Sequence, residues 1–188
     1  LPPILAELRV LEPGIDIELV PSDSTENLLF READIAVRMY RPTQLDVIAT
    51  HLCDMPIGLY AAKSYLEARG IPASIDSLLT HDFVGFDKSD LMLRLMHGLG
   101  FEAKREDFPI RCDDQIVYWN LVRAGLGIGG MQTLIADPDL GVTRIAQFIP
   151  LPPLPVWLAA PQALRHSPRI RRVFDHLSAS FKALRLDP

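Results

Sequence analysis

The 188-residue chain contains only two cysteines and no surplus of basic side chains. Cys53 and Cys112 are too few for a disulfide framework, so we expect free thiols in a reducing, cytoplasmic compartment, with a redox-sensing pair as the alternative. Lysine and arginine number 19 against 24 aspartates and glutamates, which gives a formal net charge of -5. This chain alone therefore lacks the positive surface that binds a nucleic-acid backbone, and we expect its ligand to be a small molecule or a protein.

Long apolar runs are also missing. The nearest candidate, residues 148–164, contains five prolines and cannot cross a bilayer as a helix. The start of the chain has no basic segment of a secretory signal, although a trimmed or processed start is left open. Because hydrophobic residues still make up 48% of the chain, it has enough apolar side chains for a sizeable core. We expect a globular protein with no membrane partner.

Motifs of catalysis and metal binding are absent from the sequence. No two of the five histidines stand four residues apart, and there is no Cys-x-x-Cys, nucleophile elbow or phosphate loop. We therefore expect no metal, no cofactor and no enzymatic activity. Asp113 and Asp114 could form an acid and base pair, but the cap of a helix at 113–124 is the simpler interpretation.

One glycine motif matches the dinucleotide-binding pattern in spacing only. Residues 125–130 read Gly-Leu-Gly-Ile-Gly-Gly, yet they follow an expected helix, whereas the dinucleotide motif follows a strand and opens a helix. We interpret Gly125 as a helix C-cap. The other glycines are expected in a strand, where the missing side chains let a ligand or a neighbouring backbone approach closely.

Apolar spacing predicts two series of alternating helices and strands. The first series has helices at 4–11 and 24–31, the latter capped by Ser24 or Thr25, and strands at 15–20, 34–39, 47–53 and 55–62. The second series has helices at 63–70, 75–79, 88–98 and 113–124, and strands at 83–86, 108–112 and 126–131. Strands at 140–145 and 156–160 and a strongly amphipathic helix at 170–184 close the chain. The pattern predicts an α/β fold of two lobes, each a mostly parallel sheet flanked by helices, with crossovers near 55–62 and 154–160.

Arg38 is the most suggestive charged residue. It ends an apolar strand and is followed by Met39 and Tyr40, so a guanidinium suited to a carboxylate would emerge where ligands bind in α/β sheets. The alternative is an ion pair with Glu32 or Asp34. The aromatic residues Phe86, Tyr118 and Trp119 are compatible with an aromatic or small organic acid as ligand, and equally with a place in the core.

Several short motifs occur along the chain in a characteristic order. They are Glu32-Ala-Asp-Ile-Ala-Val-Arg38, Leu59-Tyr-Ala-Ala62 with Ser64-Tyr-Leu66, Gly70-Ile-Pro72, residues 78–82, and Ala124-Gly-Leu-Gly-Ile128. The ending is Pro161, Leu164-Arg165 and Pro168 ahead of the last helix. In this order and over essentially the whole chain, the sequence resembles the effector-binding domains of LysR-type transcriptional regulators.

The resemblance implies a fold similar to type II periplasmic binding proteins. Lobe I would comprise residues 1–61 and 157–188 and lobe II residues 62–156, with a hinge at Ala61 and Ala62. A small effector in the cleft between the lobes would change DNA binding by an N-terminal winged helix-turn-helix domain, which is absent from this chain, as is the first strand of lobe I. The chain would form a homodimer and the full-length protein a tetramer. An exported solute-binding protein of a transporter is the alternative, and an enzyme on the same fold a third.

Site residues follow from the resemblance by position. The expected effector-binding residues are Arg38, Met39, Tyr40, Phe86, Asp87, Asp113, Ile128, Gly129 and Met131, with residues 1–3 and 130 also bordering the cleft. Dimers of this family pair side by side, the first helix and strand of lobe I packing on the matching elements of lobe II in the partner. The expected interface residues are Leu5, Leu8, Ile17, Leu19, Ile110, Trp119 and Val122. Packing of these side chains onto the lobe's own sheet is the alternative.

Overall fold

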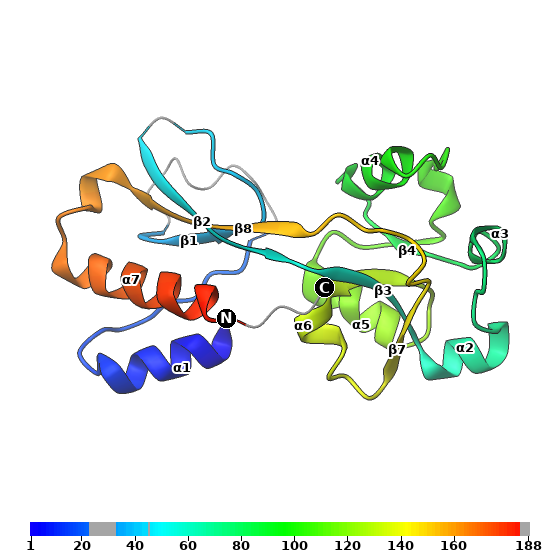
Figure 1. Ribbon diagram of the computed structural model, residues 1–188, viewed down its shortest axis with the longest axis horizontal. Helices are drawn as coiled ribbons and strands as arrows, with labels where there is room; N and C mark the ends of the chain where they lie inside the picture. Colours follow the sequence, from blue (N-terminus) through cyan, green and yellow to red (C-terminus); the bar gives the residue numbers. More distant parts are fainter. Residues whose placement is uncertain (23–32, 45, 185–188) are drawn as a thin grey trace. The chain divides into compact units, whose positions relative to one another are not determined.

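The computed structural model describes residues 1–22, 33–44 and 46–184 (Figure 1). The fold is mixed α/β, and the chain divides into two compact units. Unit 1 comprises Leu1–Met55 and Pro153–Pro188, and unit 2 comprises Pro56–Pro152. The boundaries lie a few residues before those expected, so Ala61 and Ala62, the expected hinge, are buried inside unit 2.

Unit 1 is a three-stranded sheet covered by the last helix. Strand β8 (Leu154–Pro161) lies between β1 (Ala36–Arg38) and β2 (Val47–Met55) and is antiparallel to both. Helix α7 (Pro168–Lys182) turns its apolar stripe toward this sheet, with Leu177 and Phe181 buried beside Val156 and Leu158. Each such side chain contributes about 1.5–3 kcal/mol by leaving water. Helix α1 (Pro2–Leu11) packs beside α7 (Figure 1).

Unit 2 contains a second three-stranded sheet and a short parallel pair. Strand β3 (Ile57–Ala62) lies between β6 (Gly129–Gln132) and β7 (Val142–Ile145) and is antiparallel to both. Strands β4 (Val84–Gly85) and β5 (Ile110–Arg111) are parallel. The helices are α2 (Lys63–Arg69), α3 (Ile75–Leu78), α4 (Leu91–Gly98), α5 (Gln115–Arg123) and α6 (Thr133–Ala136).

The expectation of mostly parallel sheets is wrong. In the part of the chain that the structure describes, the only parallel pairings are β4 with β5 and the bridge between Phe83 and Ile128. Hydrophobic periodicity shows which residues face a core, but it carries no information on the direction of the neighbouring strand. Direction was decided by β8, which the chain reaches after completing unit 2 and which then lies between β1 and β2.

Two expected elements differ from the structure or lie outside it. Residues 15–20 pair with no other described strand, and the N–H of Ile15 instead donates to the carbonyl of Glu12 at 3.0 Å. Alternating polarity alone does not supply a pairing partner, so this strand prediction is wrong. The short helix expected from Ser24 or Thr25 to Arg31 lies outside the described residues. Helix α6 was not expected.

Candidate functional site

Three parallel segments of unit 2 end at one edge. Strand β4 leads into Phe86 and Asp87, and β5 leads into Asp113. The segment that enters β6 runs parallel to β4, because the N–H of Val84 donates to the carbonyl of Ile128 at 2.9 Å. This segment continues into Gly129. Since ligands of open α/β sheets bind beyond the carboxyl ends of parallel strands, this edge is the candidate site.

Asp113 holds the loop that follows β4. Its Oδ1 accepts the backbone N–H groups of Asp87 at 3.0 Å, Lys88 at 3.0 Å and Ser89 at 3.2 Å. Although partial burial acts to raise the pKa of Asp113, the N–H groups of Lys88, Ser89 and Asp87 lower it below its ordinary value. Because the loop is tied down in this way, α4 begins at Leu91 and not at 88 as expected.

Asp114, the next residue, has a different role. Its carboxylate accepts the N–H groups of Ile116 at 3.0 Å and Val117 at 2.8 Å, so it is the N-cap of α5. The prediction of a capping aspartate is confirmed at Asp114. The two adjacent carboxylates bind two different segments of backbone, so they are not arranged as an acid and base pair.

Asp87 is engaged by two arginines. The Arg105 guanidinium donates to Oδ1 of Asp87, and Nε of Arg111 lies 3.3 Å from the same oxygen. The hydrogen bond from Arg105 is the main cause that lowers the pKa of Asp87. Beside these groups lies a hollow of about 110 Å³, whose lining includes Phe86, Met92 and Phe108. The carboxylates of Asp87 and Asp113 therefore shape the loop around this hollow and stay ionised at neutral pH.

Tyr118 connects Phe86 with the glycines of β6. Its hydroxyl oxygen accepts the N–H of Gly130 at 2.8 Å, and its ring centroid lies 5.0 Å from that of Phe86. Burial raises the pKa of Tyr118 to about 12, so the phenol is neutral. From the sequence, Tyr118 was compatible both with a contact to an aromatic ligand and with a place in the core. Its spacing of four from Val122, which is also buried, was the signal for the inner face of α5.

The remaining expected residues of unit 2 serve packing. Ile128 is fully buried in the core. Gly129 lies so close to α5 that an added Cβ would be 2.4 Å from Cγ2 of Val122. The glycine motif follows α5 and leads into β6, so it is no dinucleotide loop, and close approach of neighbouring groups explains Gly129 as predicted. Gly125, with φ of 84°, is the left-handed residue that ends α5. Met131 is half-buried in the cluster around Tyr60.

In unit 1, Arg38 ends β1 as predicted and pairs in register with Trp157 of β8. Met39 and Tyr40 follow and are 39% and 36% exposed. The Arg41 guanidinium lies over the Trp157 ring, 5.5 Å from its centroid. Glu32, one of the alternative partners of Arg38, lies outside the described residues.

The expected interface residues differ in exposure. Leu8 and Val122 are only 1% and 0% exposed within their own units, so packing onto the own unit accounts for these two. Leu5, Ile110 and Trp119 are partly covered, whereas Leu19 is 53% exposed. Further exposed apolar side chains near the expected interface residues are Val10, Leu11, Ile116 and Val117. They lie on the same two helices, α1 and α5, that the expected interface uses.

No group of three or more histidine, cysteine, aspartate or glutamate side chains within residues 1–22, 33–44 and 46–184 is arranged to hold a metal ion. Over the same ranges, no helix has both the length and the apolar character needed to cross a membrane.

Comparison with known proteins identifies relatives along the whole chain. The LysR substrate binding domain family matches residues 1–182. The HTH-type transcriptional regulator CrgA of Neisseria meningitidis (serogroup C, strain 8013) is 33% identical over 151 residues, which are 79% of this chain and 50% of CrgA. An HTH-type transcriptional repressor of Pseudomonas aeruginosa is 29% identical over 160 residues, 82% of this chain and 49% of the repressor. This chain thus spans about half the length of these relatives.

Solved structures show the same fold. The regulatory domain of CrgA superposes with a TM-score of 0.83 at 23% identity, over 95% of this chain and 90% of that domain. The effector binding domain of AmpR from Citrobacter freundii superposes with a TM-score of 0.75 at 14% identity, over 97% and 91%. The family match over nearly the entire length establishes that the chain belongs to the LysR substrate-binding domain family.

Proposed function

We propose that this chain is the ligand-sensing and dimerisation part of a LysR-type transcriptional regulator. Its two units would be arranged as in type II periplasmic binding proteins, with a small effector bound between them. DNA binding would belong to an N-terminal winged helix-turn-helix domain of the longer protein. The relatives named above are transcriptional regulators, which supports a regulatory and not a catalytic role.

One observation supports the effector site above all others. Phe86, Asp87, Asp113 and Gly129 meet at the carboxyl ends of the parallel segments of unit 2, where a ligand is expected on physical grounds. Asp87 and Asp113 are already paired with arginines and backbone N–H groups, so they would orient the loop and leave Phe86 to contact the effector. Arg38 at the end of β1 would bind the carboxylate of an organic acid.

The effector would act by shifting a population of conformations. A ligand changes such an equilibrium only by the difference between its affinities for the two states. An effector of this regulator must therefore bind one arrangement of the units or subunits better than the other. Only this difference in affinity can change DNA binding.

The test is a thermal-shift screen of the full-length regulator with small organic acids, followed by DNA footprinting. A true effector at 100 times its Kd adds about 2.7 kcal/mol to the stability of the state that binds it, and it must also change the footprint. Phe86→Ala is expected to abolish the shift, whereas Phe148→Ala, which removes an exposed phenylalanine of the same unit, is expected to retain it. A ligand that changes the melting temperature but not the DNA footprint would contradict the proposal. So would a ligand whose thermal shift is the same in Phe86→Ala as in the wild-type protein.

Dimerisation is tested separately by sedimentation equilibrium of the 188-residue chain. Val117→Asp on α5 is expected to raise the dimer dissociation constant at least about tenfold, since burying an unpaired carboxylate is costly. Leu140→Asp, a substitution at an 85% exposed residue outside the expected interface, is the control. A monomer at all concentrations is the behaviour expected of an exported solute receptor and would refute this part of the proposal.

A further inference from the structure

Unit 1 contains a larger hollow than the one beside Asp87. It measures about 340 Å³ and lies between the sheet and the start of α7. Its lining consists of Ile48, Ala160, Pro161, Leu164, Arg165, His166, Ile170, Arg171 and Phe174. None of the residues expected to bind the effector belongs to this set. Small-molecule sites occupy roughly 300–1,000 Å³, so this hollow has the size of a site for a small ligand.

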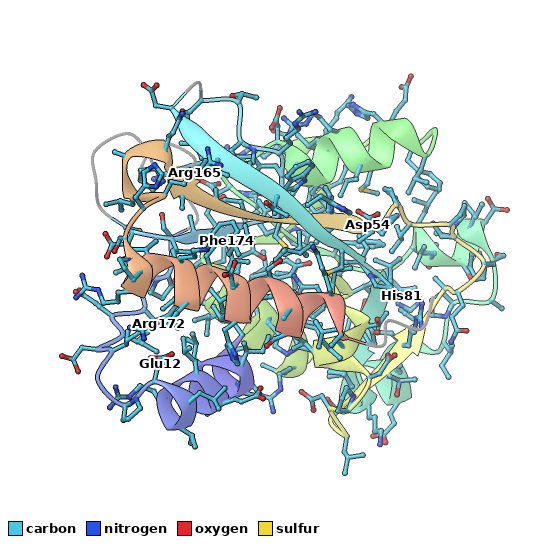
Figure 2. The ribbon with its side chains drawn as sticks, turned by 60° about the vertical axis from the view of Figure 1, so that its left-hand side comes forward. Glu12, Asp54, His81, Arg165, Arg172 and Phe174 are labelled. Atoms are coloured by element: carbon cyan, nitrogen blue, oxygen red, sulfur yellow. The ribbon has the colours of Figure 1, made fainter. Side chains whose placement is uncertain are left out.

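The inner surface of the hollow is apolar and well anchored. Ile48 and Ala160 are register partners on β2 and β8, so they present adjacent side chains on the sheet. Ile170 and Phe174 stand four residues apart on α7 and therefore lie on one face of that helix. Ile170 is only 8% exposed. Phe174, labelled in Figure 2, is half-buried against the core of unit 1. A flat or branched hydrocarbon group bound here would be shielded from water on several sides.

The rim of the hollow is positively charged. The charged residues that line it are two arginines, Arg165 and Arg171, and no lining residue is acidic. Arg171 has a partner, because its Nε lies 3.6 Å from the carboxylate of Asp175. Among the described residues, no side-chain hydrogen bond or ion pair involves Arg165. Its guanidinium, on the turn just before α7 (Figure 2), is therefore available to an anion.

We propose that this hollow is a second ligand site, which takes a small amphipathic monocarboxylate. The hydrocarbon part would pack on Ile48, Ile170 and Phe174, and the carboxylate would pair with Arg165, whose planar guanidinium matches two carboxylate oxygens. An exposed ion pair contributes little by itself. Binding therefore requires both the apolar contact and the charge, which selects amphipathic acids over inorganic anions and over neutral hydrocarbons.

The experiment is an NMR titration of the isotope-labelled 188-residue chain with 2-naphthoate as probe. We expect saturable shifts of the resonances of Ile48, Ala160 and Ile170, with a Kd below about 1 mM. Naphthalene-2-carboxamide has the same rings without the charge, and it should bind about three- to fivefold more weakly. Shifts confined to residues 86–89 and 113 would support the effector site of unit 2 and overturn the second site. Absence of saturation up to 10 mM, roughly −2.7 kcal/mol, would also overturn it.

Variants separate the charge of Arg165 from the general positive charge of this region. Arg165→Gln is expected to weaken 2-naphthoate binding about three- to fivefold, with partial recovery in Arg165→Lys, which keeps the charge but loses the planar fork. Arg169→Gln is the matched control, because it removes one exposed arginine four residues away that does not line the hollow. Equal weakening by Arg165→Gln and Arg169→Gln would refute a specific contact with Arg165.

Discussion

Gly129 and Gly130 are neighbours on β6, yet the structure predicts opposite outcomes when each is replaced by alanine. A Cβ on Gly129 would lie 2.4 Å from Cγ2 of Val122 and 2.8 Å from the Tyr118 hydroxyl, whereas the nearest atom to a Cβ on Gly130 is the carbonyl oxygen of Gly58 at 4.0 Å. Carbon atoms in contact are normally about 3.5–4.0 Å apart. Gly129→Ala therefore requires a displacement of about 1 Å or more, and Gly130→Ala requires none.

The neighbouring side chains cannot move aside without a large cost in free energy. Val122 and Tyr118 are 0% and 1% exposed, and the Tyr118 hydroxyl also accepts the N–H of Gly130, so neither side chain can rotate into empty space. Overpacking of a core costs about 1–3 kcal/mol, and we place Gly129→Ala at about 3 kcal/mol. Gly130→Ala should be neutral or stabilise by up to about 1 kcal/mol, because alanine restricts the unfolded chain.

Urea unfolding followed by tryptophan fluorescence measures the difference. The chain has two tryptophans, Trp157 in unit 1 and Trp119 in unit 2. In a Trp157→Phe background, the signal comes from Trp119, which packs edge-on against Tyr60 at 6.0 Å between ring centroids. We expect the midpoint of Gly129→Ala to fall and its melting temperature to drop by about 6–12 °C. Equal stability of the two alanine variants would show that the packing of α5 on β6 is not as tight as described.

Four further outcomes follow from the contacts of unit 2. Asp113→Ala should increase amide exchange in residues 87–89 and lower stability by about 1–2 kcal/mol, because three N–H groups lose their acceptor. The lowered pKa of Asp113 means that its contribution is complete above the ordinary carboxyl pKa and is lost as pH falls through the lowered folded-state pKa, so the wild-type chain but not Asp113→Ala should lose this increment in acid titrations of stability. Tyr118→Phe should cost about 1–3 kcal/mol in urea unfolding by leaving the N–H of Gly130 without its acceptor. Tyr60→Phe, which removes the 2.5 Å hydrogen bond to Asp137, should cost about 1 kcal/mol in the same assay.

Local features of the fold could be predicted because their causes lie within a few residues. The stripe of α7 follows from helical spacing, the start of α5 from the cap at Asp114, and its end from Gly125. Each depends on contacts within about one helical turn. The ordered motifs also led to the correct family, since they are spread over the whole chain and the family match covers residues 1–182.

The candidate site could be predicted only in part. Phe86, Asp87 and Asp113 were placed near one another by the resemblance to the family, and the structure brings them together. What Asp113 does there, holding three N–H groups of a loop more than 20 residues away in the chain, was outside the reach of local patterns. The sequence therefore predicted Asp113 as a site residue, but it did not show which backbone groups Asp113 binds.

The sequence by itself determined the order of most helices and strands, the caps of α5 and the family. The tertiary structure decided the direction of the strands, because β8 lies between β1 and β2 after the chain has built unit 2. It also decided that position 129 needs a glycine, because α5 packs closely against it, and that Arg165 lines a largely apolar hollow. Periodicity and capping are set by neighbours along the chain, whereas strand direction, close approach and hollows depend on which distant segments meet, and that is settled only when the whole core packs.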